Sequence, residues 1–433
     1  TMDLLGNRMI DLRPKTKIKQ IVITSVGDYL PFPLNLLFPL VAKKKGMVAD
    51  VKATPDVYRW KDCIAKYSPN PPKVKISLSD VALYQYTGGT TGVSKGVELT
   101  HENLTKQVQQ LATWFPDFKV GQERMLSSMP FFHVFGVGTM NFSVLMQWTQ
   151  IFIPKPQPKE LLEAIRKFKP TFTPLAPTMF IGILAHPDLK KTDLSCIKGA
   201  FSGAAPLPVE VLHEFEKVSG AIIVEGFGMT ETSPAAIANP FGDAVRKAGS
   251  VGLPLSDTII RIVDLENGTQ DMPIGEPGEL IIKGPQVMRG YKGNPEETAN
   301  VLREGWMYSG DIAIMDEDGY FFIVDRKKDM IISGGYNVYP RDIDEAFYQH
   351  PKVLEACSIG VPHPTRGECA KIFIVLKEGE TSTQEEMLEF ARTRLAVYKL
   401  PTEVEFRKEL PKTAIGKILR KELRAEELAK RKK

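Results

Sequence analysis

The chain has 433 residues, 43% of them hydrophobic and 25% charged, which is the composition of a water-soluble globular protein too long for one ordinary core. Its 56 basic and 52 acidic residues leave a formal net charge of only +4, a balance that gives no support for nucleic-acid binding. The four scattered cysteines suggest neither a disulfide framework nor a metal site, and they fit a reducing cytoplasm.

Two apolar stretches have to be weighed against membrane spans. Residues 29–42 are short and contain three prolines, and residues 130–148 are interrupted by His133, Asn141 and several glycines. We therefore expect the second stretch to form a buried helix, and we find no secretory signal at the start.

The first half of the chain alternates between strand and helix patterns. In chain order the expected elements are a strand at 18–25, a strand at 81–86, a helix capped by Thr100 that carries Leu104, Val108 and Leu111 on one face, a helix at 159–168, a strand at 170–174 followed by a helix, and a short strand at 221–224. Such alternation predicts a mainly parallel sheet with functional loops at the strand ends.

The pattern changes twice after residue 249. Residues 249–325 contain strands at 258–263 and 278–283, a turn at 316–319 and many glycines and prolines, which predicts a β subdomain. A charge run at 325–329 then precedes a helix from Pro340, strands near Ala356 and Ile372, a helix near Glu385 and a basic C-terminal helix. The run is a candidate hinge, with a solvated hairpin end as the alternative.

We therefore predict an α/β protein with two domains. The large domain, residues 1–325, consists of layered sheets and helices and includes the β subdomain at 249–325. The small one, residues 326–433, is a mobile α+β domain.

Residues 86–96 combine glycines, hydroxyl side chains and a lysine behind a strand, and we place the segment between that strand and the helix capped by Thr100. Backbone N–H groups at glycines approach phosphate oxygens closely, and the hydroxyls add donors. The lysine spacing differs from that of the GxxxxGK[ST] loop. Phosphate binding and an ordinary structural turn are equally compatible with this segment taken alone.

Three further segments carry side chains that suit a nucleotide, although each has an ordinary structural interpretation. At 225–232, Thr230 can bond a phosphate, Glu231 can ligate Mg²⁺ and Phe227 can stack on a base, or the segment is a tight capped loop. Asp311 can accept hydrogen bonds from ribose hydroxyls, or it stabilises a turn. Lys417 follows a glycine near the C-terminus and taken alone is an ordinary surface lysine.

Taken together and in this order, segments 86–92, 226–232, 308–311, 325–340 and 411–417 resemble the adenylate-forming superfamily. That superfamily contains acyl-CoA synthetases, peptide-synthetase adenylation domains and firefly luciferase. The form Gly-Gly-Thr-Thr-Gly at 88–92 looks most like long-chain fatty acid–CoA ligases. The resemblance runs from about residue 80 to the C-terminus.

The resemblance implies a role for each matching residue. Pyrophosphate is held by Thr87, Gly88, Gly89, Thr90, Thr91, Gly92 and Lys95, and adenine by Gly203, Ala204, Ala205, Gly226, Phe227 and Gly228. Asp311 and Arg326 bind ribose, Thr230 contacts the α-phosphate, and Glu231 holds Mg²⁺. Lys417 bridges the substrate carboxylate and the α-phosphate, Lys328 is the hinge, Gly334 and Gly335 line the pantetheine channel, and His133 lies near the acyl pocket.

The implied activity is ATP-dependent ligation of a fatty acid to coenzyme A through an acyl-adenylate, with release of AMP and pyrophosphate. An aryl or medium-chain acid–CoA ligase and an inactive fragment that binds nucleotide or acyl-CoA are the alternatives. The expected partners are fatty acid, ATP and CoA and no nucleic acid, in the cytoplasm. A weak contact with a membrane surface and a homodimer are compatible with the sequence, which has no amphipathic anchor.

The chain departs from the family pattern at three places. Phe227 stands where tyrosine is commoner, and Ile415 stands where threonine is common. Relatives also carry a long segment ahead of the position of Thr1, so the resemblance implies a large domain that is incomplete at its N-terminus.

Overall fold

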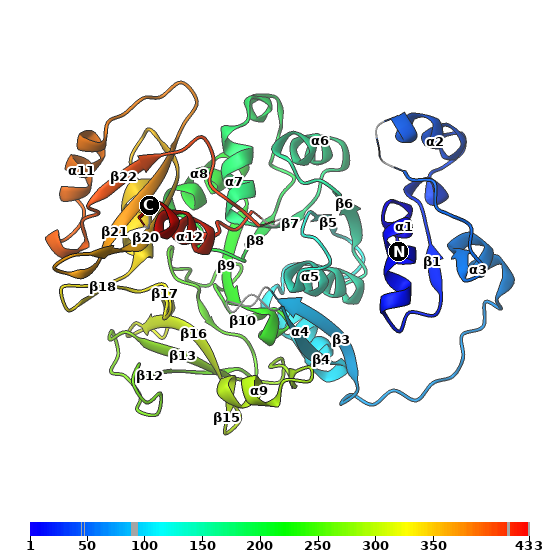
Figure 1. The fold of residues 1–433 in the computed structure, drawn as a ribbon, viewed down its shortest axis with the longest axis horizontal. Coiled ribbons are helices and arrows are strands. Elements are labelled where there is room, and N and C mark those ends of the chain that lie inside the picture. The colour runs from blue at the N-terminus through cyan, green and yellow to red at the C-terminus, as the bar shows by residue number, and fades with distance from the viewer. Residues whose placement is uncertain (45, 47, 88–93, 414–415, 432–433) are drawn as a thin grey trace. The chain divides into compact units, whose positions relative to one another are not determined.

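The computed structural model describes residues 1–433 except 45, 47, 88–93, 414–415 and 432–433. The chain forms two compact units, residues 1–76 and residues 77–433 (Figure 1). Within the described residues, no helix is both long enough and apolar enough to cross a membrane.

The first unit is built around a short parallel strand pair. Its elements are α1 (Asp3–Leu12), β1 (Ile21–Ile23), α2 (Leu34–Lys44), β2 (Val57–Arg59) and α3 (Trp60–Lys66). β1 pairs with β2 in parallel, and Ile21 and Ile23 of β1 are buried. The strand predicted at 18–25 is therefore present but shorter.

A seven-stranded sheet forms the centre of the second unit, in the order β11-β10-β9-β8-β7-β5-β6. Its strands are β5 (Arg124–Ser127), β6 (Thr149–Phe152), β7 (Phe172–Leu175), β8 (Gly199–Ser202), β9 (Ile222–Gly228), β10 (Ala235–Ala238) and β11 (Leu253–Pro254). Neighbours from β6 to β9 pair in parallel, and β10 and β11 are antiparallel. The predicted, mainly parallel sheet is confirmed.

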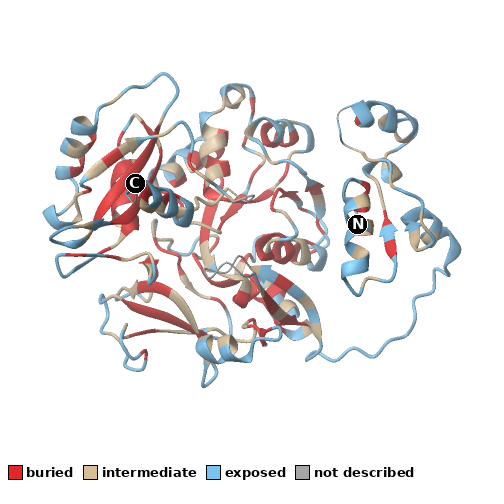
Figure 2. Ribbon diagram, viewed as in Figure 1, coloured by how far each residue is buried: buried red, intermediate tan, exposed pale blue. Residues whose placement is uncertain are grey.

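Helices supply most of the apolar side chains that cover this sheet: α4 (His101–Trp114), α5 (Val134–Leu145), α6 (Pro158–Phe168), α7 (Pro177–Ala185) and α8 (Val209–Ser219). The strands and the inward faces of these helices are buried (Figure 2). Thr100 caps α4 as predicted, because its hydroxyl accepts the N–H of Asn103 at 3.1 Å while Asn103 Oδ1 accepts the N–H of Thr100. The apolar stretch at 130–148 contains the buried helix α5, also as predicted.

One element between the first motif and α4 was not predicted. β3 (Val81–Thr87) is followed after residues 88–93 by β4 (Lys95–Thr100), and the two pair antiparallel in a three-stranded sheet with β14 (Gly290–Tyr291). The glycine-rich segment lies between a strand and the helix capped by Thr100, as predicted, but its last residues belong to the unpredicted strand β4. Val97 and Leu99 of β4 are fully buried and lie on either side of Glu98. This alternation of apolar and polar residues covers too few positions to predict a strand from the sequence.

The remaining residues form two sheets with separate apolar cores, and the first is antiparallel. The first contains β12 (Ile259–Val263), β13 (Gly278–Lys283), β15 (Leu302–Arg303), β16 (Trp306–Met315) and β17 (Phe321–Arg326), and α9 (Pro295–Val301) precedes β15. The second contains β18 (Ile331–Ser333), β19 (Tyr336–Val338), β20 (Val353–His363), β21 (Gly367–Leu376) and β22 (Glu403–Phe406), with α10 (Pro340–Tyr348), α11 (Gln384–Arg392) and α12 (Arg420–Arg431). In the second sheet all pairs are antiparallel except β21 with β22, which is parallel. We call residues 326–433 the C-terminal module; the boundary at 325/326 stays a prediction.

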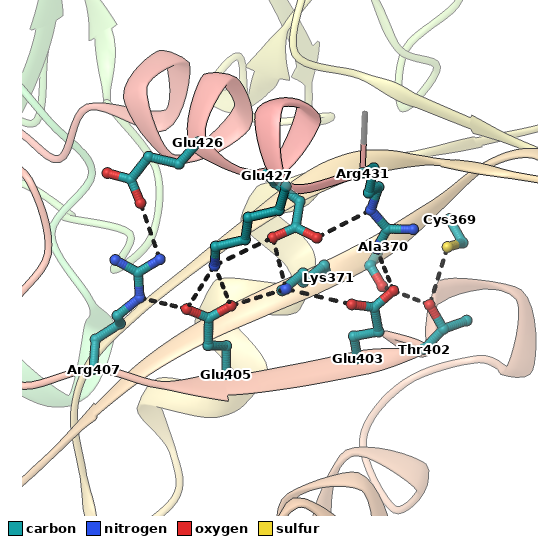
Figure 3. Close-up of polar contacts among 11 residues, drawn as sticks. Cys369, Ala370, Lys371, Thr402, Glu403, Glu405, Arg407, Glu426, Glu427 and Arg431 are labelled. Carbon is teal, nitrogen blue, oxygen red and sulfur yellow. Dashed lines mark hydrogen bonds and ion pairs between the residues drawn. The ribbon is translucent and has the colours of Figure 1, made fainter. Parts of the chain in front are cut away.

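A buried ionic network holds α12 on β21 and β22 (Figure 3). Lys371 Nζ lies 2.8 Å from Glu427, 2.9 Å from Glu405 and 3.3 Å from Glu403, and Lys371 is only 6% exposed. Because α12 begins three residues after Lys417, this network also fixes the end of the segment that carries that lysine.

Candidate active site

Two predicted adenine-contacting segments lie side by side at the carboxyl ends of the neighbouring strands β8 and β9. Ser202 at the end of β8 pairs with Glu225 of β9, so residues 203–205 and 226–228 both follow that register point. Carboxyl ends of parallel strands form the edge where α/β sheets bind ligands. The structure therefore brings Gly203, Ala204, Ala205, Gly226, Phe227 and Gly228 to one edge, as the sequence predicts.

Close packing gives the glycines at this edge a second function. A Cβ on Gly228 would lie 1.8 Å from Pro234 O, and one on Gly226 would lie 2.6 Å from the ring of Phe201. Phe227 is half-buried, pairs with Ile237 of β10 and packs against the apolar core of the β subdomain. Glycine is therefore required at 226 and 228 by close packing within the protein.

Glu231 is a buried carboxylate in the short helix η4 (Thr230–Thr232) at the same edge. Glu231 is 8% exposed, and its Oε1 accepts the hydroxyl of Tyr291 at 2.6 Å. Burial, and then the Glu231 charge, raise the pKa of Tyr291. Thr230 is half-buried beside it. Sequence reasoning missed Tyr291, because only the pairing of β14 with β4 brings it to η4.

Lys95 lies opposite Thr87 in the β3–β4 register, so the two ends of the phosphate motif are joined as a hairpin. Its ammonium pairs with Glu297 of α9 and sits 5.2 Å from the ring centroid of Tyr291. The predicted phosphate residues Gly88, Gly89, Thr90, Thr91 and Gly92 lie outside the described residues.

Asp311 and Arg326 face each other on neighbouring strands. They are register partners on β16 and β17, and Arg326 Nε lies 3.3 Å from Asp311 Oδ1. Asp311 is 5% exposed, and burial raises its pKa, against the opposing effects of Arg326 and Lys417. The predicted ribose pair is thus preformed, and Lys417 lies within electrostatic range of it.

Lys417 follows Gly416, which packs against Thr178 at the start of α7. Its N–H donates to the Thr413 hydroxyl at 3.1 Å, and Lys412 forms a β-bridge with Ile418. Gly416 has φ +82°, and a Cβ there would lie 2.0 Å from Thr178 Oγ1 at the start of α7. Glycine is required at this position both by conformation and by space.

The charges around Lys417 favour an anion. Burial, and then the neighbouring Arg326, lower the pKa of Lys417 to about 8, and Asp311 opposes both. Arg420 and Lys328 add to the repulsion. Among the largest electrostatic influences on Lys417, three positive side chains stand against the carboxylate of Asp311, and a polyphosphate would relieve that excess. The residues present therefore fit ATP.

His133 joins the same cluster from another element. It precedes α5, where its Nδ1 accepts the N–H of Phe135 at 3.2 Å. Burial, and then the charge of Lys417, lower the pKa of His133 to about 4, so the ring is neutral at pH 7. The structure thus unites four predicted residues from four segments: His133, Asp311, Arg326 and Lys417.

Lys328 and the glycine pair at 334–335 belong to the C-terminal module. Lys328 is exposed in the turn between β17 and β18. Gly334 and Gly335 form the β18–β19 turn with φ +58° and +86°, and a Cβ at either would meet nothing within 4 Å. Glycine is set there by backbone conformation alone, and the space beside the turn is open.

The carboxylates fit a metal ion that arrives with its phosphates better than a resident one. Among the residues that the structure describes, no group of three or more metal-ligating side chains occurs. Mg²⁺ at nucleotide sites is commonly held by one or two carboxylates together with substrate phosphates and water. Glu231 alone satisfies that requirement.

Comparison with known proteins identifies the family. The AMP-binding enzyme family matches residues 11–292, and the C-terminal domain of AMP-binding enzymes matches residues 342–417. A long-chain-fatty-acid–CoA ligase of Bacillus subtilis (strain 168) is 49% identical over 431 residues, 99% of this chain and 76% of that protein. A feruloyl-CoA synthase of an Amycolatopsis species is 40% identical over 356 residues, 82% of this chain and 71% of that protein.

A solved structure supports the same assignment. The ATP-bound crystal structure of MatB from Rhodopseudomonas palustris is 30% identical, with a TM-score of 0.79 over 94% of this chain and 78% of that one. The expected fold class, a large α/β domain followed by a small α+β domain, is confirmed by this likeness. The chain belongs to the AMP-binding enzymes, the adenylate-forming superfamily that its five motifs resemble.

Proposed function

We propose that this protein joins a long-chain fatty acid to coenzyme A, using ATP and passing through an acyl-adenylate. The observation that carries the proposal is the meeting of Lys417 with the Asp311–Arg326 pair beside the edge where β8 and β9 end. The class of acid rests on the relative from Bacillus subtilis, which is a long-chain-fatty-acid–CoA ligase.

Lys417 has the central role in the first step. Attack of the fatty-acid carboxylate on the α-phosphorus of ATP builds negative charge on a five-coordinate phosphorus. The ammonium of Lys417 and the hydroxyl of Thr230 would stabilise that charge, and no general base is required because the nucleophile is already an anion. His133 is neutral, so it does not compete with Lys417 for the carboxylate.

The other residues hold the substrates in line. Asp311, oriented by Arg326, would accept hydrogen bonds from the ribose hydroxyls. The segment 87–95 would hold the pyrophosphate, with Lys95 exchanging Glu297 for phosphate. Glu231 would hold Mg²⁺, which supplies positive charge to the phosphates when bound.

The second step needs a different arrangement of the C-terminal module. The thiol of CoA must reach the acyl carbon, and Lys417 stands where that approach is needed. Rotation about the turn that contains Lys328 would withdraw Lys417 and bring the Gly334–Gly335 turn toward the thiol path. The thiolate then displaces AMP from the acyl carbon. We place this reaction in the cytoplasm; membrane contact and dimerisation stay predictions.

The test is ATP–pyrophosphate exchange with a panel of acids, followed by thioester formation with CoA. We expect exchange with palmitate and not with acetate or cinnamate. Exchange with cinnamate would favour an aryl acid–CoA ligase, the second candidate, which the 40% identity to a feruloyl-CoA synthase supports. Exchange with none of the acids would contradict the proposal and favour a binding function only.

A further inference from the structure

Glu225, at the base of the nucleotide edge, is a buried carboxylate without a complete set of partners. It precedes Gly226 in β9 and is 2% exposed. Its Oε1 accepts the N–H of Leu207 at 3.1 Å, and its Oε2 has no hydrogen-bond partner among the described residues. A buried carboxylate in such surroundings needs a counter-charge to remain ionised.

Arg341 supplies that counter-charge from another part of the chain. It is the second residue of α10 and is 9% exposed. Burial raises the pKa of Glu225 to about 7, and Arg341 is the charged group that opposes this rise. Glu345, one turn further along α10, has its Oε1 3.7 Å from Arg341 Nε, so the guanidinium pairs with Glu345 while it acts electrostatically on Glu225.

Arg341 also bridges the turn at 326–330. Its guanidinium donates to the carbonyl of Ile323, and its backbone N–H donates to Asp325 Oδ2 at 2.8 Å. Ile323 and Asp325 belong to β17, before the turn, whereas α10 follows it. The side chain therefore joins the C-terminal module to β17 and, electrostatically, to the start of the nucleotide edge.

We propose that Arg341 is a positioning residue for acyl-adenylate formation: its buried guanidinium, bonded to the carbonyl of Ile323 in β17 and within electrostatic range of Glu225, holds the C-terminal module in the arrangement that places Lys417 at the nucleotide edge. The proposal rests on the proposed function, because it concerns the first of the two steps. Arg341 and Lys417 are both carried by the module, so an interaction that fixes one part of the module against β9 and β17 also limits where Lys417 can lie.

The interaction belongs to only one of the two arrangements. Once Lys417 is withdrawn for attack by the thiol, α10 moves with the same module and Arg341 leaves Glu225. Removing the guanidinium should therefore weaken the first step and spare the second. A residue that only stabilised the fold would affect both steps alike.

The main experiment compares the two half-reactions in Arg341→Met. Methionine keeps the unbranched stem and the helix propensity, and the backbone bond to Asp325 does not depend on the side chain. We expect palmitate-dependent ATP–pyrophosphate exchange to fall by about 10²-fold, the scale for small misplacement of a catalytic group. Transfer from supplied palmitoyl-AMP to CoA should be unchanged. Arg341→Lys, which keeps the charge, should restore part of the exchange.

A double variant tests the partner. Arg341→Met leaves the Glu225 carboxylate buried without its counter-charge, whereas Arg341→Met with Glu225→Gln removes both charges and leaves a side chain that still accepts from Leu207. We expect the double variant to exchange faster than Arg341→Met alone. Arg392→Met, on the exposed end of α11, is the control and should behave as wild type in both reactions. Equal losses in the two half-reactions, or additive losses in the double variant, would overturn the proposal.

Limited trypsin digestion gives a reading that does not need catalysis. The turn contains Arg326, Lys327 and Lys328, and Lys327 Nζ is held 3.0 Å from Glu279 in the arrangement described. We expect cleavage in this turn to be faster in Arg341→Met than in wild type and in Arg392→Met. If the wild type shows ATP–pyrophosphate exchange with no acid but the cleavage difference is found, the proposed function fails, whereas the holding of the C-terminal module by Arg341 is supported. A cleavage rate in Arg341→Met equal to that of wild type would show that Arg341 does not hold the C-terminal module.

Discussion

At the scale of single residues, the environment of a side chain decides its function more than its identity does. Lys417 and Lys371 are both lysines of the C-terminal module. Lys371 lies among three carboxylates, which together with hydrogen bonds raise its pKa although burial opposes them. Lys417 lies among cations, and burial with Arg326 lowers its pKa to about 8. Only Lys417 is left with a charge that awaits a substrate.

The lowered pKa of Lys417 predicts how adenylation depends on pH. Below about pH 8 the ammonium is present in the free enzyme, and above it the charge is lost. We expect kcat/KM for ATP in the exchange reaction to fall about tenfold per pH unit above that point. In Lys417→Ala, kcat/KM for ATP should be lower by a factor of about 10²–10³ and should not show this fall above pH 8.

The control for this prediction is Lys408→Ala, at an exposed position of the same module, which should keep the wild-type profile. The rate of acyl transfer from supplied palmitoyl-AMP to CoA should not show this fall above pH 8 in wild type or in Lys408→Ala. A wild-type exchange rate that stays level well above pH 8 would contradict the assigned function of Lys417.

At the scale of elements, local signals in the sequence predicted most helices and strands and missed those that depend on distant partners. The cap of α4 and the apolar face of Val108 and Leu111 are local, and they were predicted correctly. β4 is a short strand whose neighbours β3 and β14 lie on either side of it, and β14 is nearly two hundred residues away in the chain. For the same reason the sequence did not place Tyr291 beside Glu231.

The network around Lys371 ties α12 to β21 and β22 through one buried side chain. We expect Lys371→Met to remove the cation that Glu403, Glu405 and Glu427 share. The three carboxylates keep ion pairs with Arg407, Lys430 and Arg431, so the loss should be below the about 3–5 kcal/mol that an unpaired buried charge costs. Amide hydrogen exchange in α12 should then become faster, because local opening becomes easier.

A matched comparison isolates the charge effect in α12. Lys371→Met combined with Glu427→Gln removes the most buried of the three carboxylates that lost Lys371 and should recover part of the protection. Lys408→Met should leave α12 as in wild type. If the protection of α12 is the same in Lys371→Met, the network is not what holds the helix.

At the scale of the whole molecule, the five motifs predicted the family and the site, whereas their geometry needed the fold. His133, Asp311, Arg326 and Lys417 are spread over nearly three hundred residues, and each taken alone had an ordinary interpretation. They meet because α5, β16, β17 and the turn before α12 converge. Arg341 could not be predicted from motifs, since its importance depends on its bonds to Ile323 and Asp325 across the turn and on its charge near Glu225.

The turn at 326–330 is where we expect the two arrangements to differ. Lys328→Pro fixes φ at the centre of this turn, and among the described residues no hydrogen bond from the Lys328 backbone N–H is found, so proline removes none. We expect transfer to CoA to slow while ATP–pyrophosphate exchange is kept.

Lys328→Ala serves as the comparison, because it removes the side chain and leaves the backbone free. It should support both half-reactions. Transfer at the wild-type rate in Lys328→Pro would show that the turn does not pivot at this residue.

The ion pairs that tie α12 to β21 and β22 also have a mechanical consequence. The segment that carries Lys417 to the nucleotide edge has to be positioned accurately, so the element after it must be rigid. A helix held by ion pairs to two strands is more rigid than one held by apolar contacts alone. With α12 braced, strain from any swing would concentrate in the five residues 326–330. The position of the lysine would then be set by very few torsion angles.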